Sequence, residues 1–157
     1  MNFSVFNQIS RVVSGGQTGV ERAALDWAIG RKIAHGGWCA HGRRAEDGRL
    51  NVRYQLLETV TDSDLAATQL NVTESDGTLI INTGELEDGA LAARQIAEQA
   101  GKPCLVLQLE GIDLAPLVDA VAGWVKANAI ATLNITGPQE SERPRIYRLA
   151  RLFLASV

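Results

Sequence analysis

The sequence predicts an α/β fold, a three-layer Rossmann-like domain in which helices cover both faces of a mostly parallel sheet. Short apolar runs alternate along the chain with longer segments in which apolar residues recur every three or four positions. Glycine-bearing turns follow four of the predicted strands. No internal repeat, low-complexity tract or linker interrupts this alternation, so we expect a mostly parallel sheet. We expect one ligand-binding domain over residues 1–157, a length typical of a single core.

A glycine-rich turn follows the first predicted strand. Residues 11–13 have the character of a short buried strand, and we expect a helix from Val20 to about Ile29. Thr18 and Glu21 have the spacing of a capping box, which makes Thr18 the expected N-cap. Glycine allows the backbone to approach a ligand, and the free amides of a first helical turn attract anions. We therefore predict an anion site formed by Gly15, Gly16, Gln17, Thr18 and Gly19.

The alternative for this turn is structural, because any turn from a strand to a helix favours glycine. The run also lacks the G-x-G-x-x-G spacing of dinucleotide-binding folds and the G-K-[ST] of a Walker loop. It therefore indicates either an anion loop of another kind or a turn without a ligand.

A second pair of glycines follows the next predicted strand. Residues 32–40 are typical of a short strand that leads into a loop, and this stretch contains Gly36, Gly37 and Trp38. In a parallel sheet this loop and the first one lie at the carboxyl ends of neighbouring strands, where α/β folds bind ligands. We therefore include these three residues in the candidate site.

Residues 41–49 concentrate charge in a segment without apolar periodicity. Guanidinium groups match the oxygens of phosphate, so Arg43 and Arg44, together with Arg49 and Arg53, suit a phosphate ligand. Glu46 lies in the same segment and joins the candidate ligand-binding residues. A solvated surface loop is the alternative, and we weigh the two equally.

The rest of the chain continues the alternation of strands and helices. The turn at residues 75–77 precedes a β-branched run that is typical of a central parallel strand. Asp76, Gly77, Thr78, Gly84 and Gly137 from these later turns join the candidate site. Short helical pieces are expected at 54–61 and 63–72, strands at 78–82, 104–109 and 130–135, and helices at about 90–100, 114–128 and from 141 onward.

Composition and charge narrow the classes of function. The net charge is −3 with both signs interspersed, which argues against a nucleic-acid partner and against a membrane-surface face. No apolar run approaches the roughly eighteen residues of a membrane span, and the N-terminus lacks the pattern of a secretory leader. We therefore expect a soluble, cytoplasmic protein whose partner is a small molecule.

Cysteine and histidine are scarce in this chain. Cys39 and Cys104 are too few for a disulfide framework and lack metal-type spacing. His35, Cys39 and His41 lie close together in the sequence, so zinc binding is an alternative to local packing and hydrogen bonding. Because no C-x-x-C pair accompanies them, we expect no metal site.

Several ordered runs along the chain carry a resemblance to a known family. They are residues 14–26, 36–39 with 42–48, 58–59, 71–72, 75–80 and 133–138. Together they resemble the putative molybdenum carrier family, which is similar in fold to the lysine-decarboxylase-like phosphoribohydrolases and the DNA-processing Rossmann proteins. The resemblance implies a modified Rossmann domain, often a homo-oligomer, that binds molybdenum cofactor or another phosphorylated small molecule.

The resemblance also extends to single residues. It implies that Gly15 to Gly19 form the family's first anion loop, that Gly77 and Thr78 begin its central strand, and that the charged segment at residues 43–47 matches fully. The chain departs from the family at residues 87–90, where such proteins more often carry a Gly-Gly-Thr run that forms a second phosphate cradle. Asp88 would repel an anion there, and Ala90 lacks the threonine hydroxyl. The phosphoribohydrolases carry a glutamate base three residues further on, where this sequence has Ala93.

Three classes of function compete. A carrier or binding protein for a phosphorylated pterin or nucleotide needs anion loops and no general base, and this is the class that we expect. An enzyme acting on a nucleotide or phosphosugar would need an acid or base such as Glu46, Asp47, Glu58 or Asp76 beside the glycine loop. A DNA-processing or protein-interaction module would need a basic or exposed apolar face, and the acidic, mixed composition argues against the first of these.

Overall fold

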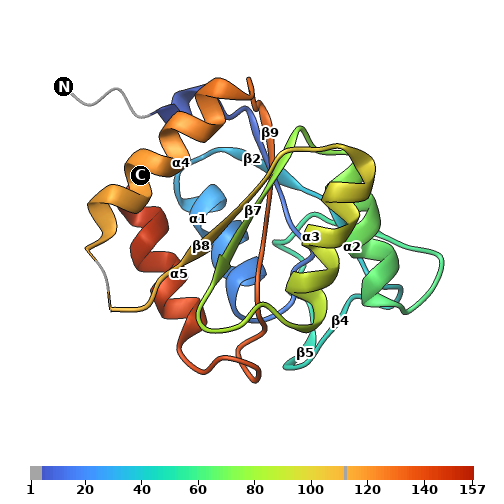
Figure 1. The fold of residues 1–157 in the computed structure, drawn as a ribbon. Helices are drawn as coiled ribbons and strands as arrows, with labels where there is room; N and C mark the ends of the chain where they lie inside the picture. Colours follow the sequence, from blue (N-terminus) through green and yellow to red (C-terminus); the bar gives the residue numbers. More distant parts are fainter. Residues whose placement is uncertain (1–4, 112) are drawn as a thin grey trace.

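A parallel sheet forms the centre of the protein (Figure 1). The computed structural model describes residues 5–111 and 113–157. Within these residues five strands form the sheet in the order β2-β1-β9-β7-β8, and all neighbouring pairs are parallel. The strands are β1 Arg11–Val13, β2 Ala34–Gly36, β7 Gly77–Asn82, β8 Cys104–Gln108 and β9 Thr132–Thr136.

The strand order is that of a Rossmann sheet with a shifted starting point. Counted from β9 through β1, β2, β7 and β8, the spatial order becomes 3-2-1-4-5, with which the Rossmann order begins. The strand that opens a Rossmann domain is therefore the last strand of this chain. The predicted α/β class with a mostly parallel sheet is confirmed.

Helices cover both faces of the sheet. They are α1 Val20–Gly30, α4 Leu114–Ala127 and α5 Ile146–Ala155 on one face, and α2 Asp64–Thr73 and α3 Asp88–Ala100 on the other (Figure 1). Side chains alternate along β7 between the two layers, since Leu79 and Ile81 pack with the first group and Ile80 packs with the second. This is the three-layer arrangement that the sequence predicts.

Smaller elements lie at both edges of the sheet. A short 3-10 helix, η1 Val5–Gln8, precedes β1 at the amino edge. At the carboxyl side, β3 Trp38–Cys39 pairs in parallel with β6 Leu57–Glu58. β4 Arg44–Ala45 pairs with β5 Gly48–Arg49 in an antiparallel hairpin. The charged segment of the sequence is therefore a compact hairpin with Glu46 and Asp47 at its tip.

Three local predictions differ from the structure. Residues 54–61 contain strand β6 and no helical piece. Residues 32–40 form two strands in place of one, because Gly37 has a φ of 122° and breaks the extended run. α5 begins at Ile146, since Arg145 has a φ of 76° and a left-handed residue cannot belong to a right-handed helix.

The predicted capping box is also wrong. Gly19 is the N-cap of α1, and no side chain caps the helix. The hydroxyl of Thr18 donates to Glu46 and accepts from the amide of Glu140, while Glu21 accepts from Thr136. Thr18 and Glu21 therefore bond to residues far away in the sequence and do not form the local bonds of a capping box.

Among the described helices, none has both the length and the apolar character needed to cross a membrane. Cys39 and Cys104 are free thiols. His35 accepts a hydrogen bond from the amide of Gln55 at 3.2 Å. Within residues 5–111 and 113–157, no three His, Cys, Asp or Glu side chains are grouped so that they could hold a metal ion, so zinc binding by His35, Cys39 and His41 has no support.

Candidate functional site

The carboxyl ends of β1, β9 and β7 bring together segments that are distant in the sequence. The loops after β1 and β9 lead to α1 and α5 on one face, and the loop after β7 leads to α3 on the other. The loops after β9 and β7 therefore diverge. Such a divergence is the topological switch point, beside which open α/β sheets bind their ligands.

A carboxylate of the protein itself occupies part of the glycine loop after β1. Oε1 of Glu21 accepts from the amide of Gln17 at 3.1 Å, and Oε2 accepts from the hydroxyl of Thr136 at 2.9 Å. A Cβ added at Gly15 would lie 2.8 Å from Oε1, so the carboxylate lies directly against this glycine. Burial raises the pKa of Glu21, although these hydrogen bonds act in the opposite direction. The start of the loop therefore already holds an acidic group.

Two glycines allow the loops to pack closely. A Cβ at Gly19, whose φ is 79°, would collide with the carbonyl oxygen of Pro138. A Cβ at Gly137 would collide with the carbonyl oxygen of Ile81 and with Val20. Both glycines are therefore required for the contact between the loops after β1 and β9 and the end of β7.

The tip of the β4–β5 hairpin closes over the same loop. Glu46 accepts from the hydroxyl of Thr18 and from the amide and hydroxyl of Ser141, at 3.1 and 2.5 Å for the latter two. Asp47 forms a two-pronged ion pair with Arg22 of α1, with both N–O distances at 3.0 Å. These hydrogen bonds lower the pKa of both carboxyl groups. Glu46 and Asp47 are therefore ionised acceptors near neutral pH.

The carboxamide of Gln17 connects the loop to its surroundings. Its Nε2 donates to the carbonyl of Arg44 at 3.3 Å and to Asp64 of α2 at 3.1 Å. Its Oε1 accepts from the amide of Glu46 at 3.2 Å. The side chain of Gln17 therefore holds the hairpin and α2 in place and is not directed toward a ligand.

A cleft of about 810 Å³ opens between the hairpin, α1 and the start of α5. This volume lies in the range of small-molecule sites. The wall combines one arginine, four carboxylates and two tyrosine rings. The cleft is lined by Thr18, Gly19, Arg22, Asp26, Glu46, Asp47, Tyr54, Glu140, Ser141, Pro144 and Tyr147.

Asp26 connects the two tyrosines of the cleft. Its carboxylate oxygens accept from the hydroxyls of Tyr54 and Tyr147, each at 2.6 Å. Arg53 and Arg151 lie 3.5 and 3.8 Å from the same carboxylate. Burial and the bond to Asp26 raise the pKa of Tyr54 to about 12 and also raise the pKa of Tyr147. Both hydroxyls therefore stay protonated and fix the orientation of the rings.

The N-termini of two helices meet at this cleft. Glu140 caps α5, because it accepts from the amides of Arg145 and Tyr147 at 2.7 and 2.9 Å. The amides of Thr18 and Gly19, just before α1, donate to no other residue that the structure describes. These two amides remain available for an anionic group.

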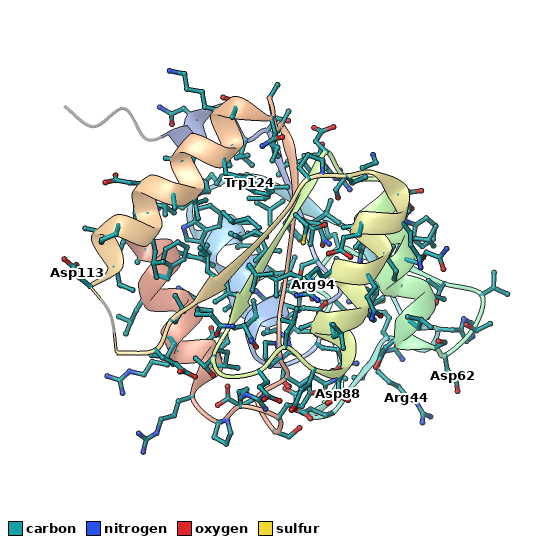
Figure 2. All side chains as sticks on the ribbon, in the orientation of Figure 1. Arg44, Asp62, Asp88, Arg94, Asp113 and Trp124 are labelled. Carbon is teal, nitrogen blue, oxygen red and sulfur yellow. The ribbon has the colours of Figure 1, made fainter. Side chains whose placement is uncertain are left out.

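A second group of charged side chains lies where the loops after β7 and β9 meet. Arg143 donates to two carbonyls of the loop after β7 and to the carboxylate of Glu87 at 3.3 Å. Asp88, labelled in Figure 2, lies at the start of α3. Burial and the neighbouring carboxyl group of Asp88 raise the pKa of Glu142. The family's second phosphate cradle is expected at residues 87–90. Here Asp88 and Glu142 form an acidic pair at that place.

A comparison with protein-family models matches residues 12–157 to the circularly permutated YpsA SLOG family. The chain belongs to this family. The strand order agrees with the description, since β9 takes the place of the first Rossmann strand at the end of the chain.

A solved structure supports the same assignment, whereas a search of curated proteins finds no match. The chain is similar to a putative molybdenum carrier protein from Syntrophus aciditrophicus SB, with 42% sequence identity and a TM-score of 0.92. The match covers 96% of this chain and 94% of that chain. The resemblance to the putative molybdenum carrier family is confirmed.

The predicted site residues Gly36, Gly37 and Trp38 of this chain lie outside the cleft. Gly37 packs against the backbone of Ser14, where a Cβ would lie 2.5 Å from the carbonyl oxygen. Asn71 of α2 accepts from the amide of Trp38 at 2.8 Å and donates to its carbonyl at 3.0 Å. The three residues join the loop after β2 to α2.

Arg43 and Arg44 have different surroundings, and neither lines the cleft. Arg43 donates to the carbonyls of Asn51, Tyr54 and Leu56 at 3.0, 2.8 and 3.4 Å. Its guanidinium therefore holds the loop at residues 50–56. The side chain of Arg44 has no partner among the described residues and extends away from the ribbon (Figure 2).

Asp76, Gly77 and Thr78 lie at the opposite edge of the sheet. Asp76 accepts from the amides of Ala131 and Thr132 at 3.0 and 2.8 Å, and these bonds lower its pKa. Gly77 and Thr78 begin β7, so they lie at the amino ends of the parallel strands. The structure does not bring these three residues together with the glycine loop.

The remaining two predicted glycines lie at the carboxyl edge. The carbonyl of Gly84 accepts from the carboxamides of Asn82 and Gln108, both at 3.0 Å. Gly137 lies between α1 and β7, as described above. Of the predicted residues, Thr18, Gly19 and Glu46 line the cleft, and Gly15, Gly16 and Gln17 lie in the loop beside it.

Several residues of the cleft were missed as ligand candidates in the sequence. Arg22 and Asp26 lie four residues apart on α1, so helical periodicity places them on one face behind the glycine loop and could have identified them. No spacing in the sequence identifies Tyr54 and Tyr147 as residues of the cleft. Their partner Asp26 is 28 and 121 residues away along the chain.

Proposed function

We propose that this protein is a binding or carrier protein for a phosphorylated pterin, with the molybdenum cofactor as the candidate ligand, held in the 810 Å³ cleft. The observation that carries the proposal is the combination of oriented tyrosine rings, ionised carboxylates and free amides on one wall. The similarity to a protein named putative molybdenum carrier supports this class of ligand.

The ring of a pterin matches the polar and aromatic wall of the cleft. A pterin is flat and carries adjacent N–H and NH₂ donors on one edge. Tyr147 offers aromatic surface for such a ring, and Asp26 holds it in place. Tyr54 is 6% exposed and has the guanidinium groups of Arg22 and Arg53 over its ring, so it supports this wall from behind. Ionised Glu46 and Asp47 have further lone pairs for the two donors.

The phosphate of the ligand is assigned to the end of the glycine loop. The amides of Thr18 and Gly19 are free and lie at the N-terminus of α1, where the helix dipole favours negative charge. Arg22 lies one turn further along α1. The beginning of the loop is not assigned to the phosphate, because the carboxyl group of Glu21 already lies there.

The chemistry of the cleft suits the organic part of the molybdenum cofactor. No cysteine or histidine is among the described residues that line it. The proposal therefore assigns the pterin ring and phosphate to the chain and assigns no protein ligand to the metal.

An enzymatic function has less support, because it needs a base in the cleft whose pKa lies near neutrality. Glu21 and Glu142, whose pKa values are raised, do not line the cleft. The pKa values of Glu46 and Asp47 are lowered, and Asp76 lies at the far edge of the sheet. Glu58 accepts from the amide of Gly42 at 2.7 Å and does not line the cleft. Ala93 is fully buried on α3.

Calorimetry with three phosphorylated probes tests the proposal. Guanosine monophosphate has the same N–H and NH₂ edge as a pterin monophosphate, whereas adenosine monophosphate lacks it. The three probes are a pterin monophosphate, guanosine monophosphate and adenosine monophosphate. We expect the pterin and guanosine monophosphates to bind at least about tenfold more tightly than adenosine monophosphate. Glu46→Gln should reduce this preference, and Glu98→Gln on the distant helix α3 serves as the matched control.

Native mass spectrometry of the purified protein provides a second measurement. We expect a retained small molecule whose mass fits a phosphorylated pterin. Equal affinity for guanosine and adenosine monophosphates would contradict the claim that Glu46 and Asp47 recognise the N–H and NH₂ donors of the ring. An empty protein that binds none of the three probes would overturn the carrier function.

A further inference from the structure

A second hollow lies between the last turn of α1 and the outer face of α5. Its volume of 630 Å³ is in the range of small-molecule sites. Arg148, Arg151, Leu152 and Ala155 line it, and their spacing of three or four residues places them on one face of α5. Tyr147 is the one described residue that lines both this hollow and the cleft. The two are therefore distinct places on the surface.

The hollow offers open space and apolar surface. Gly30, the last residue of α1, lines it. Beyond the chain neighbours and the helix backbone, no heavy atom lies within 4 Å of the position that a Cβ of Gly30 would take. Leu152 is 52% exposed in the same hollow. The apolar body of a ligand could therefore lie here and cover Leu152.

Three guanidinium groups surround this space. They belong to Arg31, Arg148 and Arg151, and no carboxylate is among the described lining residues. Within residues 5–111 and 113–157, Arg148 forms no hydrogen bond or ion pair. The positive charge of Arg148 is therefore not neutralised by the described part of the chain.

Arg31 and Arg151 are held in place but retain free donors. The guanidinium carbon of Arg31 lies 5.9 Å from the ring centre of Trp27, and that of Arg151 lies 5.9 Å from the ring centre of Tyr147. Arg31 donates to the carbonyl of Val157 at 2.9 Å, and Arg151 donates to the hydroxyl of Tyr147 at 3.1 Å. A guanidinium has five N–H donors, so both can donate further hydrogen bonds.

The alternative for these arginines is structural, since cations stabilise the C-terminal ends of helices. This accounts for Arg31, which is the C-cap residue of α1. Arg151 lies 3.8 Å from Asp26, which neutralises part of its charge. Neither explanation applies to Arg148, because it lies in the first turn of α5, where the helix dipole disfavours a cation.

We propose that this hollow binds a small molecule with an apolar or aromatic body and two or more carboxylate or phosphate groups. Guanidinium groups donate paired hydrogen bonds to both kinds of oxyanion. Because the arginines come from two helices, a ligand with two separate anionic groups matches them better than a single anion. Arg31 and Arg148 do not line the cleft, so the site does not depend on the proposed carrier function.

Nuclear magnetic resonance of the full, ligand-free chain tests this site with isophthalate, an aromatic dicarboxylate. The chain has three tryptophans, of which Trp27 lines the hollow, whereas Trp38 and Trp124 do not. At constant ionic strength, we expect isophthalate to shift the indole N–H signal of Trp27 to saturation and to leave the other two signals in place. Benzoate has the same ring and one carboxylate, and it should bind at least about tenfold more weakly.

Two variants separate the charge of the hollow from its shape. Arg148→Glu should weaken isophthalate binding by about tenfold or more. Arg44→Glu is the matched control, because Arg44 also has no partner among the described residues and lies outside the hollow. Gly30→Leu should block binding by filling the open space, with Gly123→Leu on α4 as its control. Circular dichroism checks that each variant retains the fold.

Three results would overturn the proposal. They are a shift of Trp27 that does not saturate or that Trp38 and Trp124 share, equal affinity for isophthalate and benzoate, and an equal effect of Arg148→Glu and Arg44→Glu. Failure of the pterin and nucleotide probes to bind the cleft would leave the expected isophthalate results unchanged, so the two proposals fail separately.

Discussion

The carboxylate of Glu21 accepts a hydrogen bond from the hydroxyl of Thr136 at 2.9 Å, although the two residues are 115 positions apart in the sequence. The contact joins the first turn of α1 to the end of β9. It leaves an ionisable group against Gly15, in a loop whose sequence predicts the binding of an external anion. The internal carboxyl group therefore determines which part of the loop is open to a ligand.

We expect Glu21 to make the folded state less stable as pH rises. Burial raises its folded pKa above the unfolded value of 4.5, so its contribution is fully present below that pH and is lost as pH rises through the folded pKa. The variant Glu21→Gln cannot ionise and should lack this loss. Thermal denaturation of both proteins between about pH 4 and pH 8 measures the difference. Parallel stability curves would contradict the assignment.

The close approach of the loops predicts a large effect at Gly137. Gly137→Ala should reduce the free energy of unfolding by about 2 kcal/mol or more, because the added methyl group collides with the carbonyl oxygen of Ile81. Gly123→Ala is the control, since no heavy atom beyond its chain neighbours and the surrounding backbone of α4 lies within 4 Å of its Cβ position. That change should be neutral or stabilising. Chemical denaturation compares the two, and an equal response would show that the loops can separate.

Arg43 and Arg44 should differ in their effect on stability. Arg43→Ala removes the donor to three carbonyls of the loop at residues 50–56 and should cost about 2 kcal/mol of stability. Arg44→Ala should leave the denaturation midpoint unchanged, because its side chain has no partner among the described residues. Urea denaturation of the two single variants measures this contrast. If both variants were destabilised equally, Arg44 would have a contact that the structure does not contain.

Asp26 should control the titration of Tyr54. Burial of the ring, together with the carboxylate of Asp26, raises the pKa of Tyr54 from 10.0 to about 12, so the contribution of this tyrosine to stability is lost as pH rises through that interval. In Asp26→Asn the pKa should fall toward 10.0. Ultraviolet titration of the tyrosinate measures it, with Asp119→Asn on α4 as the control. If the pKa of Tyr54 were the same in Asp26→Asn, the carboxylate of Asp26 would not control the titration of the ring.

The proposed carrier should hold its ligand without turnover. We expect negligible release of free base from nucleoside monophosphates, because Ala93 is buried and two carboxylates of the cleft, Glu46 and Asp47, have lowered pKa values. Chromatography of the reaction mixture measures any free base. Steady release that disappears in Glu46→Gln or Glu58→Gln would replace the carrier function with an enzymatic one.

Local patterns were sufficient for most of the fold. The apolar run at residues 78–82 and the helical periodicity at residues 114–128 correspond to β7 and α4 within one residue. The same patterns failed at residues 54–61, where the short strand β6 depends on pairing with β3. A strand of two residues has too little sequence to show a period, so only its partner defines it.

The sequence by itself determined the α/β class, most of the helices and strands, and the glycine turns at the strand ends, because apolar periodicity and glycine reflect local burial and local backbone conformation. Only the tertiary structure decided the strand order, which places Thr136 beside Glu21 and Tyr147 beside Asp26. It also placed Asp76 at the edge away from the cleft. The physical reason is that these contacts join residues far apart in the chain, and their pairing depends on how all the layers pack together.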